Sequence, residues 1–530
     1  MVDTTLRRPA PYRSAPRLRS AASLVFAIAA GCAGSSPPDS SSAALPSAQA
    51  TVSRGATAPA PGFDLSITFH PGVSGKLGWV KLPEPRLLSM LGDKGASWVR
   101  LDGAMLRQVP DLHDLQLAQL SLEDTAIELD EPSLCGEALR AAVLKGKPKR
   151  LLLSFDSAIT KSVVGCLRSL AAPRFYLTGC LYRSHRDEPC RGDDELAALA
   201  ADDSVRTRVF GLASSIRLPG SLAELARFPS LEALALEPGD GAEDTPLLES
   251  LPFDDLPNVR YLDAAGENTT ARLGSSEAAR FLAHVETLIG EVELSTPLPA
   301  PCALTRVGLG VIDDRAIDAL RACRGLRELS TDTPRLASAS ALTPFHALEV
   351  VHLRHLEAED LSALATLPHL LTLEVPGARA SDFSFLAGIP TLTRLDLSFA
   401  KISDLTPLSG LTNLRALDLS ATSVADLAPI AGLTRMVELH VRETAVASIE
   451  VARGMRALEE LSIAETPVAD LTPLAGLPAL ARVMLYESKV TDAGPLLGLP
   501  KLTRANVSGL SLPAEQLRAL EQKLGSELYR

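Results

Sequence analysis

The sequence predicts an α/β solenoid, with a parallel sheet along its concave side and short helices, 3-10 segments or turns along its convex side. The first observation is an aliphatic pattern that returns every 22 residues from Leu370 to Ser508. The second is that each unit opens with L-x-x-L-x-L, an alternation typical of a short strand with one buried face. The third is a proline at one fixed place in most units, where a missing N–H suits a turn better than a sheet: Pro407, Pro429, Pro473 and Pro495.

We number each unit from position 0, so that Leu392 and Leu414 are both position 0. Positions 3 and 5 are predicted to point into the core, which places Leu417 and Leu461 inside and Asp418 and Ser462 outside. A single unit of this length cannot bury enough apolar surface to fold alone. Stability is therefore expected to come from stacking neighbouring coils and from capping both ends of the stack.

The unit LDLSATSVADLAPIAGL, residues 417–433, resembles the leucine-rich repeat family, in particular the 22-residue class of bacterial internalins. The resemblance implies a leucine-rich repeat superhelix. The chain departs from the family pattern at position 8, where an asparagine often stands. A hydroxyl there can still bond neighbouring backbone, and the residues found are Ala400, Thr422, Thr444, Thr466 and Ser488.

Residues 1–31 are predicted to be a secretion signal, because several arginines precede an apolar run that is too short to span a bilayer comfortably. The segment Ala29-Ala30-Gly31-Cys32 resembles the bacterial lipobox, which implies that Cys32 becomes the lipidated first residue. Ala33 then implies sorting to the outer membrane. The alternatives are an ordinary signal peptide or a short membrane anchor. Residues 32–61, rich in Ser, Ala and Pro, are predicted to be a disordered tether.

Cleavage before Cys32 would remove five arginines and Asp3, so the formal net charge of −12 would become −16. A chain this acidic is not expected to bind nucleic acid. Contact with the membrane is expected only through the lipid anchor.

Beyond the tether, residues 62–111 are predicted to form an amino-terminal cap, with strands in FDLSITF and WVRLDG. Residues 112–303 read as irregular repeats, in which Leu117, Leu120, Leu122 and Ile127 fit the repeat frame. Their spacing lengthens between Leu231, Val259 and Val285, which predicts longer backs such as a helix in SEAARFLAHV. The regular repeats occupy residues 304–511. Residues 512–530 are predicted to be a capping helix.

Six cysteines follow Cys32, and an exported chain permits disulfides. Cys302 and Cys323 lie at nearly the same place on adjacent coils, so one bond is predicted between them. A second is predicted between Cys180 and Cys190, which bracket a polar loop. Buried free thiols are the alternative.

The sequence contains no motif of a catalytic site that we recognise, so the chain is predicted not to be an enzyme and to need no cofactor. His352 and His355 form an HxxH, but on a strand and its following loop they do not share a helical face. No metal site is therefore expected. An active site hidden in residues 62–300 stays open as an alternative.

The leading hypothesis is a cell-envelope lipoprotein that binds an unknown protein through its concave face. The alternative is a structural lipoprotein that contacts the cell wall. The predicted binding residues occupy outward positions of the regular coils: His352, Glu374, Arg394, Asp396, Asp418, His440, Arg442, Glu443, Glu465, Arg482, Tyr486 and Glu487.

Five of these residues form a position-4 column: His352, Glu374, Asp396, Asp418 and His440. Two interpretations compete. In the first, Asp is simply common in this repeat, and Arg354, Arg394 and Arg442 neutralise the column. In the second, the column and the acidic row Glu443, Glu465 and Glu487 receive a basic partner or a cation.

Overall fold

A computed structural model describes five short strands between residues 64 and 155, and then residues 161–170, 174–178, 192–216, 219–238, 250–264, 271–273 and 275–530. The chain divides into two compact units. Unit 1 contains a hairpin in which β1 (Asp64–Thr68) pairs antiparallel with β2 (Ser74–Gly78), so the strand predicted in FDLSITF is present. Unit 2 contains the solenoid. Cys32, the predicted tether, Cys180 and Cys190 lie outside the described residues.

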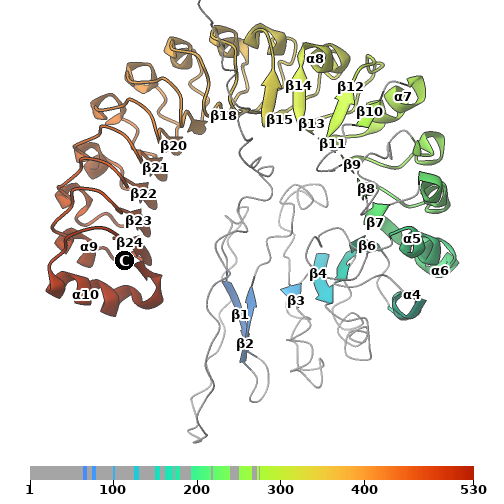
Figure 1. Cartoon of the computed structure of the whole chain (residues 1–530), viewed down its shortest axis with the longest axis horizontal. Helices are drawn as coiled ribbons and strands as arrows, with labels where there is room; N and C mark the ends of the chain where they lie inside the picture. Colours follow the sequence, from blue (N-terminus) through green and yellow to red (C-terminus); the bar gives the residue numbers. More distant parts are fainter. Residues whose placement is uncertain are drawn as a thin grey trace, which may run out of the picture. The chain divides into compact units, whose positions relative to one another are not determined.

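Unit 2 is built on one parallel sheet to which each coil contributes a strand (Figure 1). In the irregular part these are β3 (Arg100–Leu101), β4 (Asp124–Leu129), β5 (Arg150–Phe155), β6 (Phe175–Thr178), β7 (Val209–Ile216), β8 (Ala233–Pro238), β9 (Tyr261–Ala264) and β11 (Thr287–Gly290). The regular part adds β13 (Arg306–Leu309), β15 (Glu328–Thr331), β17 (Val350–Leu353), β18 (Thr372–Glu374), β19 (Arg394–Asp396), β20 (Ala416–Asp418), β21 (Glu438–His440), β22 (Glu460–Ser462), β23 (Arg482–Met484), β24 (Arg504–Asn506) and β25 (Leu528–Tyr529).

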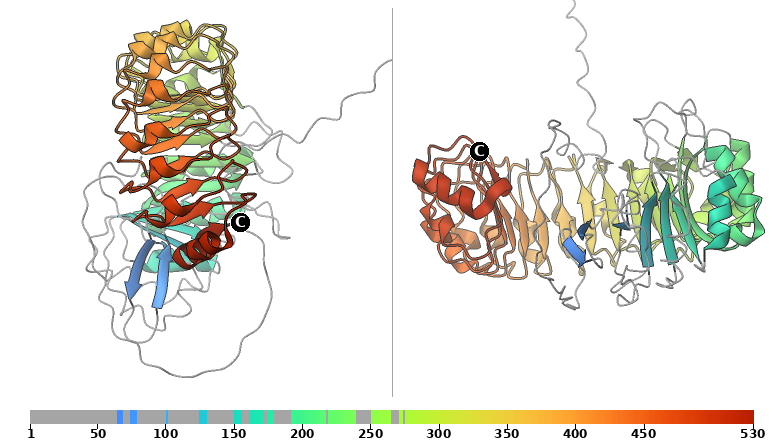
Figure 2. Two further views of the ribbon diagram at one scale, coloured as in Figure 1. Left: turned by 90° about the vertical axis from the view of Figure 1, so that its left-hand side faces the viewer. Right: turned by 90° about the horizontal axis from the view of Figure 1, so that it is seen from below.

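Two further parallel pairs lie outside this sheet. They join β10 (Ala271–Leu273) to β12 (Val292–Leu294), and β14 (Val311–Asp313) to β16 (Thr333–Arg335). The predicted α/β solenoid is thus confirmed, with strands along the concave side of unit 2 and helical segments along its convex side (Figures 1 and 2).

The strand registers reproduce most of the predicted spacing. Each pairing step from β17 to β24 keeps the predicted period, as in Leu395 to Leu417 to Leu439. Ala233 pairs with Tyr261 and Tyr261 with Thr287, which are the longer steps expected before the regular coils. One local prediction is wrong: Ile127 lies within β4, whereas the repeat frame from Leu117 put it at position 10, beyond the strand positions. The error arose because the regular frame was extended into coils that do not keep it.

The core follows the aliphatic positions of the repeat. In the coil that begins at Leu414, all seven predicted positions are at most 2% exposed, including Leu417 on β20 and Leu419 just after it. Leu461 is buried as predicted, and Ser462 on the opposite strand face is covered as well. At position 8 the hydroxyls of Thr422, Thr444 and Thr466 each donate to the carbonyl three residues earlier, at 2.6 Å. The predicted substitute for the asparagine is therefore confirmed at these three coils.

The convex side changes character along the chain. Before residue 304 it carries α4 (Lys161–Ser169), α5 (Gly192–Ala200), α6 (Asp203–Arg206), α7 (Ser276–His284), and the 3-10 segments η4 (Pro219–Arg227) and η6 (Phe253–Asp255). After α8 (Asp314–Leu320) it becomes a row of 3-10 segments: η7 (Ala339–Leu342), η8 (Ser362–Thr366), η9 (Ser384–Gly388), η10 (Thr406–Leu408), η11 (Ala428–Ile430), η12 (Glu450–Gly454) and η13 (Thr472–Leu474).

A carboxylate begins most of these 3-10 segments at position 12. Asp404 Oδ1 accepts the amide of Thr406 at 2.9 Å, and Asp426 Oδ1 accepts that of Ala428 at 2.8 Å. This is the Asx turn that satisfies an otherwise unpaired helix-start donor. The same bond recurs at Asp360, Asp382, Asp470 and Asp492, whereas serine replaces the aspartate in two coils, at Ser338 and Ser448.

Inter-coil hydrogen bonding continues beyond each strand. The position-5 amide of Leu397 donates to the backbone carbonyl of Asp418 at 2.9 Å. The position-7 amide of Phe399 donates to the backbone carbonyl of Ser420 at 2.8 Å. Position 7 is in the left-handed region, with φ between 55° and 58° at six residues that are not glycine: His355, Phe399, Ala421, Glu443, Glu465 and Glu487. Such a conformation costs about 1–2 kcal/mol per residue, which the retained inter-coil bond helps to offset.

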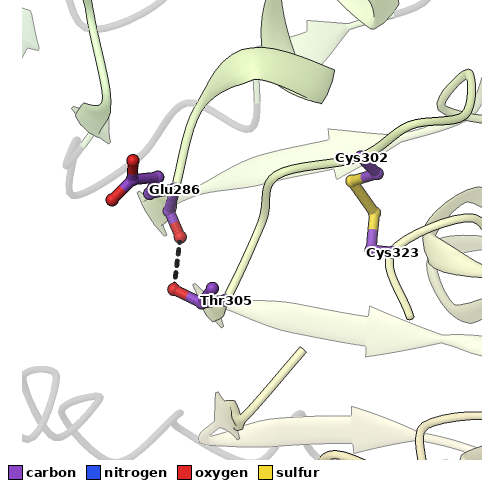
Figure 3. The surroundings of a disulfide bond; sticks show 4 residues. All are labelled: Glu286, Cys302, Thr305 and Cys323. Atoms are coloured by element: carbon purple, nitrogen blue, oxygen red, sulfur yellow. Dashed lines mark hydrogen bonds between the residues drawn. A yellow bond between two sulfur atoms is a disulfide. The ribbon is translucent and has the colours of Figure 1, made fainter. Parts of the chain in front are cut away.

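A disulfide joins Cys302 to Cys323, with an S–S distance of 2.10 Å, where the irregular coils meet the regular ones (Figure 3). Nearby on the strand side, the Thr305 hydroxyl donates to the Glu286 carbonyl at 3.1 Å. Adjacent coils are therefore tied together at both of these places.

The carboxyl-terminal coil ends in α9 (Gly494–Leu497), α10 (Ala514–Leu524) and η14 (Gly525–Glu527). The Lys523 ammonium donates to the carbonyls of Leu497 and Leu499 at 2.8 and 2.7 Å. The chain then adds β25 to the sheet beside β24, a strand that the predicted capping helix did not include. Within the described part of the chain, none of the helices combines the length and apolarity that a membrane crossing requires.

Candidate binding surface on the concave sheet

The predicted position-4 column lies on five adjacent strands in direct register. His352 is paired with Glu374, Glu374 with Asp396, Asp396 with Asp418, and Asp418 with His440. Neighbouring strands are about 4.8 Å apart, so each side chain lies beside the next. Three carboxylates are consequently stacked between two histidines.

A histidine contacts the carboxylate at each end of this stack. His352 Nδ1 lies 2.6 Å from Glu374 Oε2. Burial raises the pKa of Glu374, but the hydrogen bond and charge of His352 lower it by more than burial raises it, so the net shift is downward. At the other end, His440 contacts Asp418 at 3.5 Å and Glu460 at 3.4 Å.

His440 is consequently held as a cation at neutral pH. Burial lowers the pKa of His440, but its two carboxylate partners outweigh burial and raise the pKa to about 9. Glu460 is the corresponding anion, since His440 and then Arg482 lower its pKa to about 2 against the effect of burial. The sequence did not single out Glu460. Its place at position 2, one coil beyond His440, was the available signal.

Asp396 occupies the middle of the column with no cation beside it. Its Oδ1 accepts the amide of Ser398 at 2.8 Å, and Asp418 makes the same turn to Ser420 at 2.8 Å. Burial, followed by the charges of Asp418 and Glu374, raises the pKa of Asp396 above its usual value. At positions 2, 4 and 6 of residues 304–511, all of them described, every other charged side chain has an ion-pair partner.

The arginines that the first interpretation expected to neutralise the column make their ion pairs with other acids. Arg354 contacts Asp332, Arg394 contacts Glu438, and Arg442 contacts Glu465, at 3.1, 3.1 and 2.6 Å. Arg394 reaches across a whole coil because the intervening position 2 is the small Ala416. Arg354 and Arg394 act on Glu374 only through longer-range charge.

The remaining predicted residues form a cluster that is largely neutralised internally. Both Nε and Nη2 of Arg442 donate to Glu465 Oε1, at 2.8 and 2.6 Å. Its guanidinium also lies over the Tyr486 ring, 5.7 Å from the centroid, and 3.9 Å from Glu443. Arg482 pairs with Glu460 at 2.5 Å. Glu487 is exposed at the end of the acidic row.

The two HxxH histidines lie in different environments. His352 is bound to Glu374, whereas His355 is exposed at a left-handed position with φ of 56°. Within the described residues, no group of three or more His, Cys, Asp or Glu side chains has the arrangement of a metal site.

One exposed side chain on this surface was missed altogether. The Phe399 side chain is 63% exposed, at position 7 beside the acidic column. The repeat frame predicted that position 7 is outward, so an aromatic residue there was a readable signal. The aspartates at position 12 were also missed, although D-x-S/T recurs at that position in several units.

The chain matches no protein-family model, and it matches none of the curated proteins. Solved structures with similar coordinates include an internalin from Listeria monocytogenes, 16% identical, covering 64% of this chain and 93% of the internalin with a TM-score of 0.42. A Leptospira interrogans leucine-rich repeat protein is 15% identical, covering 78% and 91% respectively with a TM-score of 0.39.

A plant peptide hormone receptor, solved in complex with its peptide, is 16% identical and covers 73% of this chain and 62% of the receptor with a TM-score of 0.41. Since these similarities are distant, the fold assignment depends on the strand pairing and burial of this chain itself.

Proposed function

We propose that this chain is a cell-envelope lipoprotein that acts as a non-catalytic scaffold and binds a protein partner through its concave sheet. The proposal depends on one observation, that each regular coil separates buried core positions from variable outward positions. Positions 3 and 5 are aliphatic or small and buried in coil after coil, whereas positions 2, 4 and 6 change in charge and size. Parallel strands hold these variable side chains in register as one continuous surface.

The charge pattern supports recognition of a partner over a purely structural role. Long ion pairs such as Arg394 to Glu438 order side chains on an open surface but contribute little to stability, typically below about 1 kcal/mol. Ordered, complementary charges instead favour specific association with a protein of matching pattern.

Placement in the envelope rests on the amino-terminal sequence. Residues 1–31 have the composition of a secretion signal, Cys32 ends a lipobox-like segment, and Ala33 favours sorting to the outer membrane. Replacing Cys32 by Ala is expected to abolish acylation and release the protein from membranes. Mass spectrometry and cell fractionation test this, and a Cys32→Ala product that is still acylated, or equally membrane-bound, contradicts the anchor.

Site-specific photo-crosslinking in intact cells tests the binding surface. A photoreactive residue is placed at Ser420 or Met484 on the concave strands, and at Ser409 on an exposed convex turn as the matched control. We expect the concave positions to yield a discrete protein adduct and Ser409 to yield none. Adducts that form only from Ser409 contradict the proposal.

A further inference from the structure

Phe399 combines two costs that folding of its coil does not require. Its large apolar side chain is 63% exposed, and its backbone is left-handed with φ of 58°. Glycine occupies the same position at Gly377 and Gly509, and alanine does so at Ala421, whose amide makes the same inter-coil bond of 2.8 Å. A small residue therefore suffices for the fold, so the aromatic ring needs another explanation.

The residues at positions 6 and 7 next to Phe399 are small and uncharged, and the His355 ring from the coil before them lies against Gly377. Its position-7 neighbours on the adjacent coils are Gly377 and Ala421, and position 6 of the three coils holds Pro376, Ser398 and Ser420. Charged or titratable side chains occupy these positions two coils away on either side, at Arg354 and His355 before and at Arg442 and Glu443 after. A partner can therefore approach the ring without displacing an existing ion pair.

Asp396 belongs to the same coil, and its turn bonds the amide of Ser398, the residue before Phe399. It is the position-4 carboxylate flanked by two carboxylates, Glu374 and Asp418, and by no cation. The His and Arg residues on the neighbouring strands are paired with other acids, as described above. A lysine or arginine of a partner would be attracted by Asp396 and its neighbouring carboxylates, and no existing ion pair of Asp396 would have to break.

We propose that Asp396 and Phe399 form the anchor point for the protein partner, and that the partner inserts there a polypeptide segment with a lysine or arginine for Asp396 and an apolar or aromatic side chain for Phe399. This inference rests on the proposed scaffold function and specifies where and what it binds. An exposed aromatic beside a carboxylate can supply apolar contact and cation attraction together, which is the composition of many interface hot spots.

Selection of random peptides displayed on phage against the immobilised full chain at low ionic strength tests the proposal. The enriched peptides are synthesised with a fluorescent label, and their affinities are measured for the full chain and its variants. We expect enrichment of peptides that contain both a basic and an apolar residue. Asp396→Asn and Phe399→Ala should each weaken binding about tenfold, and added salt should weaken binding to the unmodified chain.

Matched variants separate this site from others. Asp404→Asn makes the same chemical change at a position-12 turn, and Tyr529→Ala removes an exposed aromatic residue from the last strand of the sheet; both should leave affinity unchanged. Tyr486→Ala tests the other predicted cluster, around Arg442. The amide oxygen introduced by Asp396→Asn can still accept the Ser398 amide, and Phe399→Ala reproduces the neighbouring coil, so unfolding temperatures should stay close to that of the parent chain. Thermal unfolding of each variant checks this.

The outcomes distinguish the two levels of the proposal. If peptides lose affinity with Tyr486→Ala and keep it with Asp396→Asn and Phe399→Ala, the scaffold function stands and the anchor is wrong. Enriched peptides without basic residues also overturn the anchor. If no enriched peptide depends on any concave residue, both the anchor and the scaffold function are wrong.

Discussion

The coils before residue 304 and the coils after it share one sheet but differ in their convex backs. The steps from Ala233 to Tyr261 and from Tyr261 to Thr287 are long, and the second of them includes the nine-residue helix α7. The step from Arg394 to Ala416 is shorter, and its back is the three-residue η10. The strand spacing is set by hydrogen bonds and is the same in both regions. The back is therefore free to lengthen without disturbing the surface that faces a partner.

Core truncation should show that the two regions are equivalent on the strand side. Leu234 and Leu417 are both buried at the strand, at 0% and 1% exposure. Leu234→Ala and Leu417→Ala should each lower the free energy of unfolding by about 2–5 kcal/mol because each leaves a cavity, and exposed Lys401→Ala should be nearly neutral. Urea unfolding measures all three. A negligible loss for either leucine would contradict the shared core.

Proline substitution should show that the two backs are different. Arg280 is exposed inside α7, so Arg280→Pro loses a helical hydrogen bond and should cost about 3 kcal/mol or more. Val451 occupies the position that holds proline in Pro407, Pro429 and Pro473, so Val451→Pro should change stability by less than about 1 kcal/mol. Arg280→Ala is the control for the lost side chain. Equal destabilisation by both prolines would contradict the distinction.

The same difference explains what the sequence could predict. In the regular coils, one frame assigns Leu417 to the core and places Asp396 beside Asp418, because every unit repeats the same geometry. Before residue 304 each coil has its own length, so the frame put Ile127 beyond the strand positions although it lies within β4 (Asp124–Leu129). Ion-pair partners could not be predicted from the sequence either. Arg394 pairs with Glu438 two coils away, and such a pairing depends on the side-chain rotamers.

The regular backs offer a smaller test at the start of η12, where Ser448 replaces the usual aspartate with the longer bond. The Glu450 amide lies 3.4 Å from Ser448 Oγ, whereas Ala428 lies 2.8 Å from Asp426 Oδ1. Ser448→Asp should restore the shorter bond at the start of η12 and raise stability by about 0.5–1 kcal/mol. Ser448→Asn gives the bond without the charge and should recover most of the gain. Urea unfolding that shows a loss for both variants would contradict the capping role of position 12.

Regular stacking also brings like charges together in the position-4 column. The smallest predicted effect is the resulting pH dependence of stability at Asp396. The raised pKa of Asp396, caused by burial and by the charges of Asp418 and Glu374, means that the folded chain holds this proton more tightly than the unfolded chain. Stability associated with Asp396 is therefore present at low pH and is lost as the pH rises through the folded pKa. Asp396→Asn should match the parent chain below about pH 3.8 and become more stable than it at neutral pH, by less than about 1 kcal/mol.

Asp404 supplies the matched control with the opposite sign, because hydrogen bonds from Thr406 lower its pKa. Its ionised form is stabilised by folding, so Asp404→Asn should lose stability relative to the parent chain as the pH rises from acid to neutral. Unfolding of Asp396→Asn and Asp404→Asn across the acid to neutral range compares the two slopes. Slopes of the same sign would contradict the assignment of Asp396 as the uncompensated carboxylate. Removing the charge should stabilise the folded chain only at Asp396, where burial and like charges outweigh the hydrogen bonds.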